Sequence, residues 1–162
     1  MASSDTGADG GGLEILTEIR DGIGYLTLHR PSRRNAMTVT MQRGIVEQLR
    51  SWDLDPGVRI VVLQGAGGHF CAGADLGRFE DSRGGVEKYL EREVNVDLYE
   101  SFTRLGKPIV AAVEGSCLGG GLGLALSCDV VLASQDASFG LPEIRSAVWP
   151  MMVMAIVFRN IG

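Results

Sequence analysis

The chain has 162 residues, of which 45% are hydrophobic and 22% charged, a composition typical of one folded domain with a hydrophobic core. It excludes a disordered chain, and no apolar run reaches the roughly 18 residues that a membrane-spanning helix needs. The 15 Lys and Arg residues against 20 Asp and Glu give a net charge of -5. This charge argues against nucleic-acid binding, because such proteins carry a basic surface.

Glycine is in excess, at 23 of 162 residues, with only 5 prolines and no triplet repeat. This pattern excludes collagen and low-complexity sequence and indicates turns and close backbone approaches. The polar residues 1–12 predict a flexible tail, so we expect one domain over residues 13–162. Cys71, Cys117 and Cys128 form no CxxC pair, which predicts reduced thiols in a cytoplasmic protein.

The first half of the chain predicts a hairpin, a helix and a strand. Apolar and polar residues alternate over 13–19 and 23–28 on either side of an Asp-Gly pair, as in two paired strands. From Thr38, apolar residues recur at helical spacing as far as Trp52, and the following DLDPG segment ends this helix. Residues 59–64 (RIVVLQ) predict a strand buried on both faces of a mostly parallel sheet.

The second half continues the alternation of helix and strand. Apolar residues at 86, 90, 94, 98, 102 and 105 predict a helix over 85–105. Two further strands are predicted over 109–113 and 129–133, followed by a short segment at Ser138 and Phe139. The apolar residues 151–157 predict a last helix.

Two glycine-rich loops follow the first two buried strands, at 65–75 (GAGGHFCAGAD) and 115–123 (GSCLGGGLG). The order of strand, loop and helix is typical of an α/β fold. Right-handed crossovers would bring both loops to the same end of the parallel strands. Open α/β sheets usually carry their sites at that end.

The motifs in these loops give little support to side-chain chemistry. Neither loop contains GxGxxG or the lysine of a phosphate-binding loop, and Glu114 replaces the glycine that a nucleophile elbow would need before Ser116. His69 and Cys71 are too few ligands for a metal site, and a loop histidine beside a buried thiol is the simpler interpretation. Two backbone N–H groups could instead form an oxyanion hole, although a glycine triplet alone favours tight packing.

Three motifs, in this order, resemble the crotonase family, also called the enoyl-CoA hydratase/isomerase family. They are residues 29–37 (HRPSRRNAM), 69–76 (HFCAGADL) and 113–133 (VEGSCLGGGLGLALSCDVVLA), which FGLPEI then follows up to residue 144. The resemblance implies a spiral of strand–strand–helix turns that binds an acyl-CoA thioester, with no cofactor besides the CoA of the substrate. It also implies C-terminal helices that build a homo-oligomer, a trimer or a dimer of trimers, so we expect the domain over 13–162 to be incomplete.

Position by position, the resemblance implies an oxyanion hole formed by the N–H groups of Ala74 and Gly120. Glu143 of the PEI motif matches a proton-transferring glutamate, whereas Gly123 stands where hydratases of the family carry another glutamate. The CoA-binding region falls on Arg33, Arg34, Ala36 and Ala72. For Arg33 and Arg34, a basic turn exposed to solvent is as good an explanation as binding of the CoA phosphates.

A single carboxylate favours double-bond isomerisation over hydration. Hydration needs one group that deprotonates water and one that delivers a proton to carbon, whereas isomerisation needs one base that removes a proton and returns it two carbons away. Asp75, Glu80 and Glu114 are candidates for a substitute acid, but solvation of loops and strand ends explains them better. Because Gly123 removes a catalytic group, a non-catalytic CoA-binding or subunit-interaction protein is the alternative.

Two features near the end of the sequence have structural interpretations. Asp129 after Cys128 matches a structural pair of the family and predicts loop hydrogen bonding. The methionine-rich segment 151–157 is typical of flexible core filling, or it shapes an acyl pocket. The apolar face of this last helix has nothing further to pack on in the sequence, which predicts a partner surface or a site of aggregation.

Overall fold

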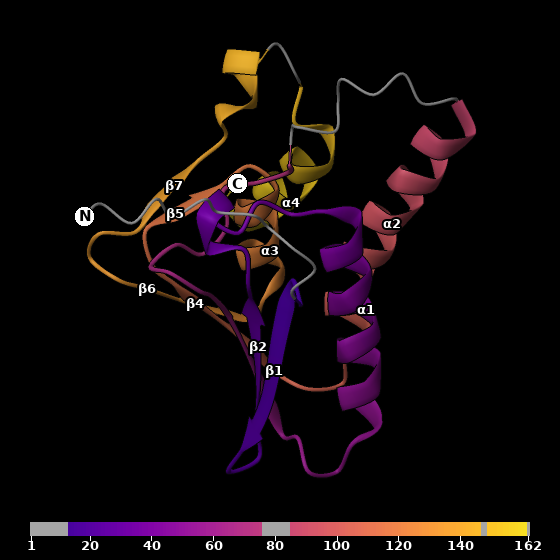
Figure 1. Ribbon diagram of the computed structural model, residues 1–162, viewed down its shortest axis with the longest axis vertical. Helices are drawn as coiled ribbons and strands as arrows, with labels where there is room; N and C mark the ends of the chain where they lie inside the picture. The colour runs from indigo at the N-terminus through magenta and orange to yellow at the C-terminus, as the bar shows by residue number, and fades with distance from the viewer. Residues whose placement is uncertain (1–12, 76–84, 147–148, 162) are drawn as a thin grey trace, which may run out of the picture.

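The computed structural model describes residues 13–75, 85–146 and 149–161, and Figure 1 shows its ribbon. The predicted tail over 1–12 and Glu80 lie outside these ranges. The strands are β1 (Ile15–Arg20), β2 (Ile23–Leu28), β3 (Ile60–Gly65), β4 (Ile109–Val113), β5 (Ser116–Leu118), β6 (Val130–Ala133) and β7 (Ser138–Gly140). The helices are α1 (Val39–Leu54), α2 (Gly85–Arg104), α3 (Gly120–Ser127) and α4 (Met151–Ile161), with short 3-10 helices at Pro31–Arg33 and Pro142–Ser146.

The larger sheet has the strand order β1-β2-β3-β4-β6 within the described part of the chain. β1 and β2 form an antiparallel hairpin, which confirms the predicted pairing, and the chain turns at Asp21 and Gly22, both with positive φ. β2, β3, β4 and β6 run parallel. The glycine-rich segments after β3 and β4 therefore leave the sheet at the same end, as the sequence predicts.

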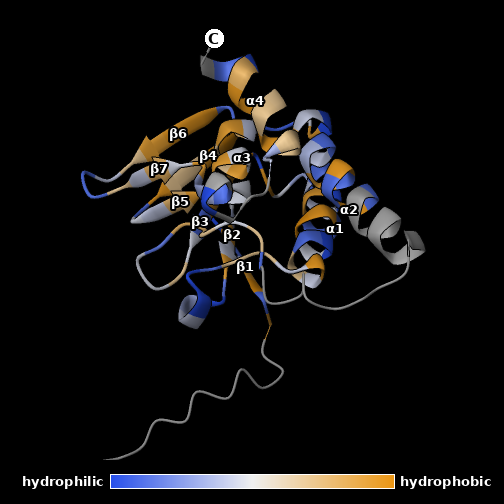
Figure 2. Cartoon of the chain, turned by 90° about the horizontal axis from the view of Figure 1, so that it is seen from above, coloured by the Kyte–Doolittle hydropathy of each residue, from blue (hydrophilic) through white to orange (hydrophobic). Residues whose placement is uncertain are grey.

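α1 and α2 lie side by side on one face of the sheet (Figures 1 and 2). α1 begins after Thr38, whose Oγ1 accepts a hydrogen bond from the backbone N–H of Met41 at 3.0 Å. Apolar side chains at helical spacing bury one face of this helix in the core, which it shares with α2. These core residues are Met41, Ile45, Leu49 and Trp52 of α1 with Leu98 and Phe102 of α2.

The segment 115–123 differs from the glycine-rich loop that the sequence predicts. Its first residues form β5, which pairs in parallel with β7, and α3 begins as early as Gly120. A strand of three residues shows no alternation, and glycines are poor helix formers, so tertiary contacts decide both elements. Gly119 has a φ of 53°, a conformation that favours glycine, and it turns the chain from β5 into α3.

Apolar side chains remain exposed on β6 and α4, which are orange in Figure 2. β6 presents Val130, Val131 and Leu132 at the surface. α4 packs on α3 and buries Val153, while Met151 and Phe158 are 73% and 63% exposed. The last helix therefore does pack on α3, and the exposed apolar face predicted for it is limited to side chains such as Met151 and Phe158. The exposure of β6 was not predicted. None of the described helices combines the length and hydropathy needed to cross a bilayer.

The cap of α1 gives a first test of the fold. Thr38→Ala removes the oxygen that accepts the Met41 N–H, and we expect it to lower the free energy of unfolding by about 1–2 kcal/mol. Thr38→Ser keeps a hydroxyl and is expected to retain most of that stability. Urea unfolding of the two variants beside wild type measures the difference. Equal losses in both variants would show that the cap hydrogen bond contributes nothing.

Candidate active site

Two backbone bridges join the three segments that build the site. Met37, just before α1, bridges Ala74, and Cys71 bridges Cys117 of β5. The second bridge consists of hydrogen bonds from Cys71 N to Ser116 O and from Leu118 N to Cys71 O, both 2.9 Å. The two predicted glycine loops therefore run next to each other.

The N–H group of Ala74 is directed away from Met37. In this bridge Met37 N donates to Gly73 O at 2.8 Å, and Asp75 N donates to Met37 O at 3.0 Å. Successive peptide groups of an extended chain point to alternate sides, so the Ala74 N–H faces the opposite side. Gly120 lies there, since a Cβ placed on Gly120 would be 3.9 Å from Ala74 N.

The N–H group of Gly120 belongs to the first turn of α3. The first N–H groups of a helix have no partner within the helix, and they carry the positive end of its dipole. A Cβ placed on Gly73 would lie 3.7 Å from Gly120 N, so the 73–74 and 119–120 segments are in close contact. The structure thus brings the two predicted oxyanion-hole residues, Ala74 and Gly120, to one place, with their amides on separate segments.

Glu143 reaches the same place from the short 3-10 helix Pro142–Ser146. Its carboxylate packs on the backbone of Gly119, because a Cβ at that position would lie 2.5 Å from Glu143 Oε1. Glu143 Oε2 is buried and has no hydrogen-bond partner among the described residues. A buried carboxylate oxygen without a partner is uncommon and indicates a functional group.

A cavity of about 570 Å³ opens beside these groups, within the range of small-molecule sites. Small, apolar and aromatic residues dominate its lining, which suits an acyl chain. The lining residues are Met37, Gln42, Ala72, Gly73, Ala74, Asn95, Tyr99, Gly119, Gly120, Pro142, Glu143, Arg145, Trp149, Pro150, Met151, Met152 and Val153. Of the two interpretations of the methionine-rich segment, the cavity favours the shaping of a pocket.

Tyr99 of α2 is a cavity residue that the sequence analysis missed. Its hydroxyl donates a hydrogen bond to Gly120 O at 3.3 Å, and a Cβ placed on Gly123 would lie 2.8 Å from that hydroxyl oxygen. Burial raises the pKa of the Tyr99 phenol, so it stays a neutral donor. Tyr99 directly follows the buried Leu98 on the helix, and nothing in the apolar pattern of 85–105 marks it as a site residue.

Comparison with known proteins agrees with this arrangement. Residues 18–162 match the family described as enoyl-CoA hydratase/isomerase, which is also called the crotonase family. The chain belongs to this family. The mixed α/β architecture predicted from the sequence is therefore confirmed as a crotonase fold.

Relatives in the crotonase family differ in their named reactions. Hydroxycinnamoyl-CoA hydratase-lyase of Pseudomonas fluorescens is 35% identical over 140 residues, 84% of this chain and 51% of that protein. A peroxisomal Delta(3,5)-Delta(2,4)-dienoyl-CoA isomerase of Arabidopsis thaliana is 32% identical over 149 residues, 84% of this chain and 53% of that protein. The solved structure of an enoyl-CoA hydratase of Mycobacterium smegmatis has a TM-score of 0.88 at 28% identity, covering 93% of this chain and 59% of that one. The chain spans about half the length of these curated relatives.

The predicted CoA-binding residues are only partly brought to the cavity. Ala72 lines it, and its N–H donates to Arg34 O at 2.9 Å. The side chains of Arg33 and Arg34 are exposed and lie outside the cavity lining. Ala36 O accepts a hydrogen bond from Arg30 Nη1 at 2.6 Å, a contact within the segment between β2 and α1.

Neither of the two candidate substitute acids that the structure describes, Asp75 and Glu114, lines the cavity. Asp75 forms an ion pair with Arg30 at 2.9 Å, Glu114 is exposed, and Glu80 lies outside the described residues. Asp129 Oδ2 accepts a hydrogen bond from Ile109 N at 2.7 Å, which confirms its structural role. Glu143 is therefore the one carboxylate among the described cavity-lining residues.

The cysteines and His69 have structural environments. Cys71, Cys117 and Cys128 are free thiols, and burial raises the pKa of Cys71 and of Cys117 to about 12. His69 Nδ1 accepts a hydrogen bond from Ser116 N at 3.2 Å. This contact agrees with the interpretation of His69 as a loop histidine beside a buried thiol. No cluster of metal-ligating side chains occurs in the part of the chain that the structure describes.

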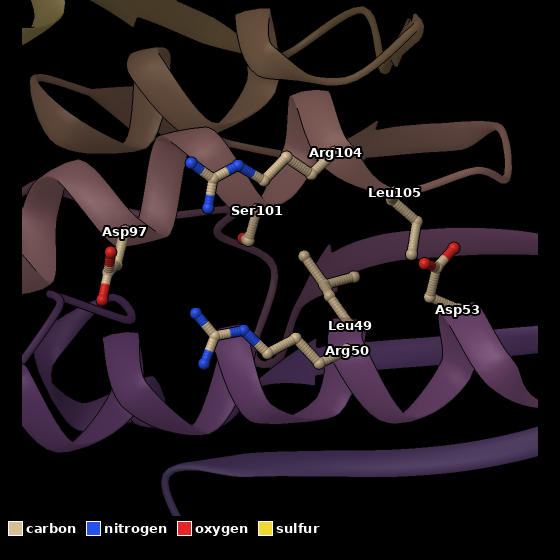
Figure 3. Close-up of a pocket in the computed structure, with 7 residues that line it drawn as sticks. All are labelled: Leu49, Arg50, Asp53, Asp97, Ser101, Arg104 and Leu105. Atoms are coloured by element: carbon tan, nitrogen blue, oxygen red, sulfur yellow. The ribbon is translucent and has the colours of Figure 1, made fainter.

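A second pocket, between α1 and α2, is much smaller (Figure 3). It has a volume of about 60 Å³, which is too small for an acyl chain. Arg50 and Arg104 extend across it, and Asp53 lies at the end near Leu105 (Figure 3). Asp53 Oδ1 accepts a hydrogen bond from Gly106 N at 2.8 Å. The Asp53 carboxylate therefore connects the end of α1 to the segment that follows α2.

Gly119 and Gly68 form a matched pair for testing the packing of Glu143. Both have positive φ, but a Cβ on Gly68 meets nothing within 4 Å. We expect Gly68→Ala to lower the free energy of unfolding by about 1–2 kcal/mol through backbone strain alone. Gly119→Ala adds a collision with Glu143 and is expected to lose about 1–3 kcal/mol more. Denaturant unfolding measures both, and equal losses would contradict the contact.

The buried thiols predict a loss of stability at alkaline pH. A cysteine in the unfolded chain has a pKa of about 8.5, whereas burial raises the pKa of Cys71 and of Cys117 to about 12 in the folded chain. Because the unfolded chain releases these protons first, the free energy of unfolding falls as pH rises from about 8.5 towards 12. We expect Cys71→Ala/Cys117→Ala to show a shallower fall in denaturant titrations at pH 8 and above. A fall as steep as that of wild type would overturn this prediction.

Proposed function

We propose that the protein acts on acyl-CoA thioesters through an enolate held by two backbone N–H groups. The observation that carries this proposal is the convergence of two amides, from Ala74 and Gly120, and one buried carboxylate oxygen of Glu143 on one apolar cavity. The amides would bind the thioester oxygen and stabilise the negative charge that develops on it. Family membership supports the same chemistry.

Glu143 transfers a proton in the proposed reaction. It removes a proton from the carbon next to the thioester of a 3-enoyl-CoA, and the electron pair spreads over a dienolate whose oxygen lies in the oxyanion hole. The same proton returns two carbons away, which gives the conjugated 2-enoyl-CoA. Nothing is consumed, and the reaction needs no cofactor besides the CoA of the substrate.

Isomerisation is favoured over hydration because of the number of carboxylates. Hydration calls for a group that deprotonates water and a group that protonates carbon, but Glu143 is the single carboxylate among the described lining residues. The names of the relatives include hydratases and an isomerase, so they support either reaction. The choice here depends on Gly123 and the single carboxylate.

The remaining parts of the proposal concern CoA, assembly and location. Arg33 and Arg34 are exposed cations suited to CoA phosphates, and Ala36 and Ala72 give room beside them. The apolar side chains exposed on β6 and α4 support a homo-oligomer of the full-length protein, a trimer or a dimer of trimers. Free cysteines support a reducing compartment such as the cytoplasm.

The role of Glu143 is tested by Glu143→Gln in the full-length protein. We expect isomerisation of a 3-enoyl-CoA to fall by about 100-fold to 10,000-fold, because general acid–base groups contribute that much, with binding of the thioester retained. The appearance of the conjugated thioester measures the reaction, and titration with a saturated acyl-CoA measures binding. Glu114→Gln is the control, since Glu114 is exposed outside the cavity.

Other outcomes separate the alternatives. Wild-type protein that binds acyl-CoA but converts neither a 3-enoyl-CoA nor a 2-enoyl-CoA favours the non-catalytic CoA-binding protein, for which Gly123 is the supporting observation. Hydration of a 2-enoyl-CoA faster than isomerisation would replace the preferred reaction with hydration. Full activity in Glu143→Gln would exclude Glu143 as the proton-transferring group.

A further inference from the structure

Tyr99, which lines the cavity, packs against Gly123 of α3. Gly120 and Gly123 are three residues apart in α3 and lie on the same face of the helix. The phenol of Tyr99 covers this face, with its hydroxyl donating to Gly120 O at 3.3 Å. A Cβ on Gly123 would lie 2.8 Å from the hydroxyl oxygen and 3.1 Å from ring carbons of Tyr99.

These distances mean that Tyr99 and a side chain at position 123 exclude each other. A Cβ closer than about 3 Å to another atom requires movement, and the ring is held by its hydrogen bond and by burial. Any longer group at position 123, a carboxylate included, would need the volume that the Tyr99 ring occupies. The ring therefore leaves Glu143 as the single described carboxylate of the cavity.

We propose that Tyr99 determines reaction specificity by filling the space in which a water molecule and a second base would stand beside the bound acyl chain. This inference rests on the proposed function and deepens it. Tyr99 lies beside Gly120, whose amide would hold the thioester oxygen, so the ring is next to the reacting part of the acyl group. An apolar ring at that place excludes water from a reactive enolate.

The two reactions differ in their need for this space. In hydration an O–H bond of water breaks, the oxygen bonds to the carbon two positions from the thioester carbonyl, and a proton ends on the carbon between them. In isomerisation one proton leaves carbon and returns to another carbon through Glu143, with no water consumed. Filling the water position therefore suppresses hydration and leaves isomerisation intact.

The test compares the ratio of hydration to isomerisation in variants of the full-length protein. Each is incubated with a 2-enoyl-CoA and with a 3-enoyl-CoA in isotope-labelled water, and oxygen incorporation and double-bond position are followed. The variants are Tyr99→Phe, Tyr99→Leu, Tyr99→Leu/Gly123→Glu and Tyr99→Leu/Gly123→Gln. A ratio of two rates in one sample does not depend on the amount of folded protein.

We expect Tyr99→Phe to keep the wild-type ratio, because the ring remains. Tyr99→Leu opens the space and should raise the ratio by about tenfold, a change of about 1.4 kcal/mol in relative barriers. Tyr99→Leu/Gly123→Glu adds a second base and should exceed its matched glutamine control by about 100-fold. Together these results would establish the ring as the determinant.

Several results would overturn the inference. They are an unchanged ratio in Tyr99→Leu, a ratio raised as much in Tyr99→Phe as in Tyr99→Leu, and loss of both reactions in Tyr99→Leu, which would make Tyr99 a structural support. Failure of the proposed function is seen separately, in wild-type protein that performs neither reaction. Wild-type isomerisation with an unchanged ratio in Tyr99→Leu overturns the role of Tyr99 alone.

Discussion

Two backbone bridges, Met37 with Ala74 and Cys71 with Cys117, hold three distant segments of the chain in register. Glycines near these bridges allow main chains to approach more closely than a side chain would permit. A Cβ on Gly65 would lie 2.0 Å from His69 O, and one on Gly115 would lie 2.3 Å from Gly68 O. These two glycines therefore serve contact between backbones in the segments that lead to the Ala74 and Gly120 amides.

The cavity combines backbone donors with very few charged side chains. Amides held by bridges and by a helix terminus need no reorganisation when charge develops on a bound oxygen. Glu143 packs directly on Gly119, next to the proposed oxyanion hole, and one of its oxygens has no partner within the described chain. Tyr99 supplies bulk and a neutral hydroxyl on the α2 side of the cavity. The proposed chemistry follows from this division between backbone donors, one carboxylate and one phenol.

The exposed apolar residues have a different meaning from those of the cavity. Val130, Val131 and Leu132 on β6, with Met151 and Phe158 on α4, form surface that a separate folded domain rarely leaves in water. The chain spans about half the length of its curated relatives. This exposed apolar surface is the observation behind the proposed oligomer.

Much of the architecture could be predicted from the sequence, because local patterns specify it. Apolar spacing predicted α1, α2 and the strands of the larger sheet, and the joint occurrence of three motifs predicted the family and the residues Ala74, Gly120 and Glu143. β5 and the early start of α3 escaped prediction, because a three-residue strand has no period and a glycine triplet has no helix preference. These elements form through contacts with segments far away in the sequence.

The sequence by itself determined the family, the α/β order of elements and the glycine at position 123, where the resemblance implies a glutamate in hydratases. Only the tertiary structure decided which side chain packs against that glycine. Tyr99 lies 24 positions before Gly123 in the chain, on another helix, and its contact with Gly123 depends on how α2 packs against α3. Side-chain packing between distant elements leaves no local pattern, so the wall of the cavity became visible only in three dimensions.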